Sequence, residues 1–162
     1  MKKYFVWLIC LLLLTSCVRT GSEPEKQLAA AQAVTAKWKD VCFSMAMTET
    51  GCEITFDTPE TLRELTLVYD GETMTANCDG LETEVPALFA AGILPLYRGV
   101  QACKAESWED AGEGLRQITL DGETFLVYYD PAGGTVTRLE AKGAKGAEGA
   151  DGYQILACIE SK

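Results

Sequence analysis

Hydrophobic residues early in the chain recur at the spacing of a helix, every three or four positions. The members of this series are Leu28, Ala31, Val34, Trp38 and Val41. Ser22 followed by Glu25 forms the pattern of a capping box, and Pro24 suits a first helical turn. We therefore predict a helix over residues 24–39, with Trp38 as its main core anchor.

From residue 41 onward the period changes to two, which is typical of strands. Three pairs place every large apolar side chain of a first hairpin on one face: Met47 with Cys52, Met45 with Ile54, and Phe43 with Phe56. A short helical turn is predicted at Thr58-Pro59-Glu60. A second hairpin follows, with strands over residues 65–69 and 74–78 around the favoured turn Asp70-Gly71.

A second helical stretch is predicted over residues 86–104, between loops over 79–85 and 105–113. Its apolar stripe consists of Phe89, Ile93, Leu96, Tyr97 and Val100. Because Pro95 cannot sit in an unbroken helix, we expect a kink or two short helices near residues 92–95.

The last third of the chain again has the pattern of strands. They are predicted over residues 118–120, 125–129, 136–141 and 153–159, with a loose Gly/Ala linker over 143–152. The chain as a whole is therefore predicted to be α+β and mainly antiparallel β, with an N-terminal helix and an inserted kinked helix.

An apolar run precedes these elements. It follows Lys2 and Lys3 and covers residues 4–14, which is shorter than the roughly 20 residues of a membrane-spanning helix. The run therefore indicates a signal peptide over residues 1–16. Leu14-Thr15-Ser16-Cys17 resembles the lipobox of bacterial lipoproteins. The resemblance implies that Cys17 becomes a lipidated N-terminus and that residues 17–23 form a tether.

Lipidation of Cys17 predicts a location. The chain would be anchored to a bacterial cell membrane and would face outside the cytoplasm, with the membrane as its first partner. Two or three acyl chains on one residue make a stable anchor. The alternative is an ordinary secretory signal in which the cysteine occurs by chance. The choice between inner and outer membrane stays open.

Composition narrows the function of residues 24–162, which have the length of one domain. The net charge of −10 becomes two units more negative without Lys2 and Lys3. Such acidity, with no basic block, argues against nucleic acid as a partner. The sequence has no histidine, so a Ser-His-Asp or Cys-His site is excluded and the commonest metal ligand is missing. We expect a protein that is not an enzyme, with no metal and no cofactor.

Five cysteines remain besides Cys10 and Cys17. They are Cys42, Cys52, Cys78, Cys103 and Cys158. Export permits disulfides, and an odd number leaves at least one thiol unpaired. The predicted register places Cys42 three strands from Cys78, too far for a bridge. We interpret the five as buried free thiols, while a bridge that involves Cys103 or Cys158 stays open.

One segment near the end of the chain carries a family resemblance. Leu120-Asp121-Gly122-Glu123-Thr124-Phe125-Leu126-Val127-Tyr128-Tyr129-Asp130-Pro131, followed by Val136, resembles a stretch of the LolA/LolB lipoprotein-carrier superfamily. The resemblance implies a single LolA/LolB-like domain over residues 24–162. It further implies a twisted half-barrel sheet, with both helical segments on its concave apolar face and acyl chains bound between them.

The candidate ligand-binding residues are the apolar side chains expected on that concave face. They are Met45, Ile54, Leu65, Leu67, Met74, Phe89, Ile93, Leu96 and Tyr97. The simpler interpretation of the same residues is that they form ordinary core. Two functions therefore stay open: a lipid-anchored protein that binds an acyl chain or another hydrophobic ligand in the cell envelope, and a lipid-anchored module with a filled core that binds an envelope protein.

Overall fold

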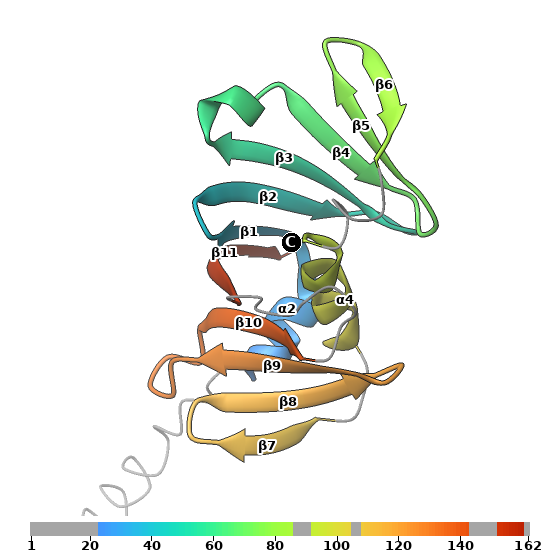
Figure 1. The fold of residues 1–162 in the computed structure, drawn as a ribbon. Helices are drawn as coiled ribbons and strands as arrows, with labels where there is room; N and C mark the ends of the chain where they lie inside the picture. Colours follow the sequence, from blue (N-terminus) through green and yellow to red (C-terminus); the bar gives the residue numbers. More distant parts are fainter. Residues whose placement is uncertain (1–22, 86–91, 105–107, 143–151, 161–162) are drawn as a thin grey trace, which may run out of the picture.

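The sheet is the dominant element of the computed structural model, which describes residues 23–85, 92–104, 108–142 and 152–160. The described strands form one open, curled antiparallel sheet (Figure 1). They are β1 (Ala31–Trp38), β2 (Val41–Met47), β3 (Cys52–Thr58), β4 (Leu65–Tyr69), β5 (Met74–Cys78), β6 (Leu81–Glu84), β7 (Glu109–Gly112), β8 (Leu115–Leu120), β9 (Glu123–Tyr129), β10 (Val136–Lys142) and β11 (Tyr153–Glu160). The predicted class, α+β with a half-barrel antiparallel sheet, is confirmed.

The order of the strands is β6-β5-β4-β3-β2-β1-β11-β10-β9-β8-β7. The last strand, β11, therefore lies in the middle and joins two meanders. It pairs with β1 on one side and with β10 on the other. The sheet consequently has an N-terminal half, β1–β6, and a C-terminal half, β7–β11.

The predicted hairpins are confirmed in their register. Met47 lies opposite Cys52, Met45 opposite Ile54, and Phe43 opposite Phe56. The second hairpin joins β4 and β5 through the turn that contains Asp70-Gly71. The helical turn predicted after Pro59 is the 3-10 helix η1, Glu60–Leu62.

The helix predicted over residues 24–39 is wrong beyond Ala30. Helix α2 covers Pro24–Ala30, and the chain continues as β1. Val34 and Ala36 are buried, and Trp38 faces the same side, so this segment also has a period of two. β1 is held between β2 and β11, and this tertiary pairing outweighs the local helical spacing. Ser22 of the predicted capping box lies outside the described residues; the N-cap of α2 is Glu23, whose side chain makes no capping hydrogen bond, and Glu25 lies beside Arg116.

Both predicted loops contain strands. Within 79–85 the chain forms β6, after a two-residue turn in which Asp79 and Gly80 have φ values of 53° and 79°. Such a turn favours an Asp-Gly hairpin. Within 105–113 it forms β7. Both are the edges of the sheet, and all their residues are exposed, so neither shows the alternating pattern that reveals a half-buried strand.

Gly51 closes the β2–β3 hairpin where a side chain has no room. A Cβ on Gly51 would collide with the carbonyl oxygen of Tyr69 on β4. We expect Gly51→Ala to lower the free energy of unfolding by about 1–3 kcal/mol, because β4 must move away. Gly133→Ala is the matched control, since its nearest neighbour would be Asp130 Oδ2 at 3.3 Å. Urea denaturation measures both; equal losses would contradict the close contact at Gly51.

The second helix, α4, covers Leu94–Ala102. Pro95 lies in its first turn, where the missing N–H has no partner to lose, so the proline begins the helix and does not interrupt it. The earlier part of the predicted helical stretch, residues 86–91, lies outside the described residues, as do the signal peptide, Cys17 and residues 143–151 of the predicted linker.

α2 and α4 pack on the same side of the sheet, mainly against its C-terminal half (Figure 1). Gly99 allows this approach, because a Cβ there would meet Leu139 Cδ2 at 2.7 Å and Phe125 Cδ1 at 3.2 Å. The core beneath the helices includes Leu28, Leu96, Val100, Phe125 and Leu139, all fully buried. Of the two described helices, neither packs mainly on the N-terminal half of the sheet.

Candidate functional site

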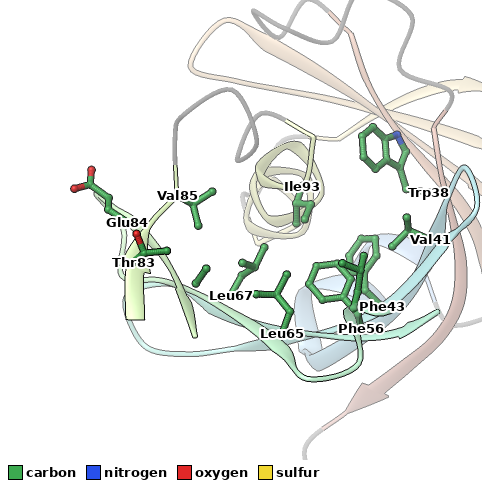
Figure 2. A pocket seen from close by; sticks show the side chains of 12 residues that line it. Trp38, Val41, Phe43, Phe56, Leu65, Leu67, Thr83, Glu84, Val85 and Ile93 are labelled. Carbon is green, nitrogen blue, oxygen red and sulfur yellow. The ribbon is translucent and has the colours of Figure 1, made fainter. Parts of the chain in front are cut away.

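A cavity of about 470 Å³ lies on the inner face of the N-terminal half of the sheet. Ligand sites in proteins commonly have this size. Its lining residues come from β1 to β6, from η1 and from the residue before α4 (Figure 2). They are Trp38, Val41, Phe43, Phe56, Leu62, Leu65, Leu67, Ala76, Thr83, Glu84, Val85 and Ile93.

The floor of the cavity follows from the alternation of the strands. Phe43 on β2 and Phe56 on β3 are opposite each other in the register, and their ring centroids are 6.2 Å apart. Leu67 and Ala76 form the next opposed pair, between β4 and β5. Because inward positions recur every second residue, the apolar side chains of neighbouring strands form one continuous surface.

Trp38 lies at one end of the cavity, and its indole ring packs against Gly92. A Cβ on Gly92 would lie 2.7 Å from Trp38 Cη2, so the glycine packs directly against the indole. The hydroxyl of the buried Tyr153 donates a hydrogen bond of 2.8 Å to the carbonyl oxygen of Gly92. Burial raises the pKa of Tyr153, which therefore keeps its proton and remains a donor.

The other end of the cavity lies at the edge strand β6. Thr83 and Glu84 are the polar members of the described lining, and both are exposed. Figure 2 shows the Glu84 carboxylate directed away from the other lining side chains. Thr83 is opposite Ala76 in the register and so belongs to the inner face. Thr83 and Glu84 therefore make this rim polar, while at the opposite end the buried Nε1 of Trp38 has no hydrogen-bond partner among the described residues.

Three of the predicted ligand-binding residues line the cavity: Leu65, Leu67 and Ile93. Five others do not. Met45, Ile54, Met74 and Leu96 are buried in the core, and Tyr97 packs edge-on against Tyr69 with ring centroids 5.4 Å apart. Phe89 lies outside the described residues.

The position of α4 explains why some of the predicted residues line the cavity and others belong to the core. Tyr97 of α4 covers Tyr69 at the end of β4 that lies beside Cys52 and Met74. Inward residues at this end of the N-terminal half are therefore core. Inward residues toward the other end, such as Leu65, line the cavity.

Sequence reasoning missed nine of the lining residues. They are Trp38, Val41, Phe43, Phe56, Leu62, Ala76, Thr83, Glu84 and Val85. Phe43 and Phe56 were placed on the correct face by the predicted register. The helix predicted over residues 24–39 includes Trp38, although the alternation of Trp38 with Val34 and Ala36 indicates a strand. Thr83 and Glu84 lie in the predicted loop, where Asp79-Gly80 could have indicated a hairpin.

The cysteine interpretation is only partly correct. Cys42, Cys52, Cys78 and Cys103 are free thiols, but Cys78 is exposed and Cys42 is half-buried. Burial raises the pKa of the Cys52 thiol to about 12, so this thiol is a poor nucleophile near neutral pH. The Cys103 thiol donates a hydrogen bond of 3.0 Å to the Gly99 carbonyl oxygen.

Charged groups of the described chain meet in the interior at a different place, between α2 and β8. Glu25 is 9% exposed, and its Oε2 lies 3.9 Å from Arg116 Nε. Arg116 also forms an ion pair of 3.3 Å with Asp110. These residues are not among the described residues that line the cavity, most of which are apolar.

No family model matches the sequence, and a search of curated proteins found no match. Within the described ranges, no helix has both the length and the apolar character needed to cross a membrane.

Proposed function

We propose that this protein is a lipid-anchored, extracytoplasmic binding protein that holds an acyl chain or a similar hydrophobic ligand in the cavity over the N-terminal half of the sheet. The observation that carries the proposal is the cavity itself. Ten apolar side chains of the described residues line it, and they border a space of about 470 Å³. Burial of a ligand there removes apolar surface from water, which is favourable by roughly 25 cal/mol per Å².

The lining also favours binding over catalysis. Among the described lining residues, Thr83 and Glu84 have charged or hydroxyl side chains, and both are exposed on β6. The Glu84 carboxylate is exposed and points away from the other lining side chains, so it does not face a ligand in the cavity. We therefore infer a non-catalytic role.

A titration with Nile red, a neutral apolar dye, tests ligand binding. The chain from Cys17 onward is suitable, because it contains every element that the structure describes. We expect saturable binding of one dye per chain, with the fluorescence increase of a dye that leaves water. A chain that is folded by circular dichroism and yet does not bind the dye would contradict the proposal.

The anchor is tested separately. Mass spectrometry of the protein isolated from bacterial membranes should find an N-terminal peptide that begins at Cys17 and carries acyl chains. An unmodified Cys17 in that sample would remove the anchor from the proposal and leave the cavity argument unchanged.

A second candidate function rests on the outer surface of the sheet. Leu156 and Ile159 on the central strand β11 are 50% and 57% exposed. Exposed apolar residues of this kind favour a protein partner, which is the function of a lipid-anchored interaction module. Substitution of both by Ser would weaken such an interaction and leave Nile red binding unchanged.

A further inference from the structure

We infer that the edge strand β6 binds an extended segment of a partner protein as an additional antiparallel strand, and that this segment carries basic residues at alternate positions. The inference goes beyond the cavity and its ligand, because it concerns the free edge of the sheet. It follows from the backbone groups, the exposure and the charge of residues Leu81–Glu84.

The backbone of β6 has hydrogen-bonding groups on the side that faces away from the sheet. β6 is the terminal strand and pairs with β5 on its other side (Figure 1). The Val85 N–H donates a hydrogen bond of 2.7 Å to the Met74 carbonyl oxygen. Bonded and non-bonded positions alternate in an antiparallel pair, so the N–H and C=O groups of Glu82 and Glu84 point away from β5. A row of such groups is a template for a further strand.

The edge strand at the other end of the sheet, β7, is less suited to such pairing. Its register with β8 shifts between Asp110 and Gly112. The Asp110 side chain accepts a hydrogen bond from the Gly112 N–H and forms an ion pair with Arg116. Irregularities of this kind protect sheet edges from further pairing. β6 keeps an unbroken register with β5, and all four of its residues are exposed. The accessible, regular edge is therefore β6.

Charge at this edge selects a basic segment over a second copy of the chain. Glu82 is opposite Asn77 and Glu84 is opposite Thr75, so both glutamates belong to the outer face of the sheet. Residues of an added strand that bond to Glu82 and Glu84 place their side chains on the same face, where opposite charges attract and like charges repel. Two copies of β6 would place glutamate opposite glutamate, in a chain whose net charge is −10. Lysine or arginine at these positions gives complementary pairs.

The inner side of the same edge favours apolar residues between the basic ones. Leu81 is opposite Cys78 and is 77% exposed. Thr83 is opposite Ala76, and both line the cavity. An apolar side chain of the added strand would lie beside Leu81 and Thr83 and would cover apolar surface that is now in water. The expected segment therefore alternates basic and apolar residues.

Binding of the fluorescein-labelled peptide Lys-Val-Lys-Val-Lys-Val to the chain from Cys17 onward tests the inference. Fluorescence anisotropy should show saturable binding of one peptide per chain, and the amide hydrogens of Glu82 and Glu84 should exchange more slowly when the peptide is bound. Two control peptides should bind at least tenfold more weakly. One has glutamate in place of lysine, and the other has N-methylated lysines, which keep their charge but cannot donate a backbone hydrogen bond to β6.

Three results would overturn the inference. They are the absence of binding by the lysine peptide, equal binding by the N-methylated peptide, and a stable dimer of the chain alone in sedimentation that Glu82→Lys abolishes. The second would show an association by charge without an added strand. The third would show that a second copy occupies the edge.

Variants of β6 separate its charge from its backbone. Glu82→Gln combined with Glu84→Gln should weaken peptide binding roughly threefold to tenfold, as expected for two exposed ion pairs. Glu109→Gln combined with Glu113→Gln removes the same charge beside β7 and should leave binding unchanged. Equal weakening in both would contradict a site at β6.

Glu82→Pro removes an N–H that the sheet does not use, and proline is tolerated at such edge positions. Peptide binding should fall at least tenfold. Nile red binding should persist, because Glu82 is not among the residues that line the cavity. The dye therefore reports folding and the proposed function separately from the edge. Unchanged peptide binding by Glu82→Pro would overturn the inference and leave the proposed function standing.

Discussion

Ala76→Phe should abolish ligand binding without unfolding the protein. Ala76 is half-buried on β5, and its methyl group lines the cavity opposite Leu67 on β4. A phenyl ring at this position would occupy the space that an alkyl chain needs. We expect the affinity for Nile red to fall at least tenfold, which corresponds to about 1.4 kcal/mol. The free energy of unfolding should stay the same or rise, because the ring fills empty space and does not displace packed atoms.

Ala46→Phe is the matched control for this variant. Ala46 is exposed on β2, and it is not among the residues that line the cavity. The same substitution there should leave dye binding unchanged. Comparable binding by Ala76→Phe and the wild type would contradict the proposed site.

Alanine substitutions at two of the predicted ligand-binding residues should distinguish a residue of the packed core from a residue that lines the cavity. Ile54 is fully buried, so Ile54→Ala leaves a new hole and should lower the free energy of unfolding by about 2–5 kcal/mol. Leu65 is half-buried and already borders empty space, so Leu65→Ala should cost less than about 1.5 kcal/mol. Urea denaturation of both variants measures the difference.

The affinity for Nile red should fall more in Leu65→Ala than in Ile54→Ala, the reverse of the expected losses in stability. Leu65→Ala removes apolar contact with the ligand and should weaken Nile red binding, whereas Ile54→Ala should leave it nearly unchanged in the fraction that is folded. Equal stability losses for the two variants would mean that Leu65 is as tightly packed as Ile54 and that the cavity is closed in solution.

The sequence predicts the paired strands well and the edges poorly. The register of Phe43 with Phe56 follows from period-two alternation, because a shift by one residue would turn every apolar side chain outward. The edge strands β6 and β7 bury no side chain, so no alternation marks them. The segment of β1 fits both patterns: Leu28, Ala31, Val34 and Trp38 have helical spacing, and Val34, Ala36 and Trp38 alternate as in a strand. Only the neighbours β2 and β11 decide between the two.

The site is harder to predict than the fold for a related reason. Alternation identifies which residues face inward, and it places Ile54 and Leu65 in the same class. Whether an inward residue is packed or borders a cavity depends on where α4 lies across the sheet. That position follows from contacts distant in the sequence, such as Gly99 with Leu139 and Tyr97 with Tyr69. The alternation of apolar and polar residues along one strand does not reveal these contacts between distant segments.

The most direct test of the binding function is native mass spectrometry of the chain from Cys17 onward, produced in bacteria without its signal peptide and purified without detergent, as wild type and as Ala76→Phe. The cavity predicts that the wild-type chain retains one small hydrophobic molecule in a one-to-one complex and that the Ala76→Phe chain does not. Wild-type protein that is folded and free of any bound molecule, and that does not take up dodecyl maltoside when it is added, would contradict the account.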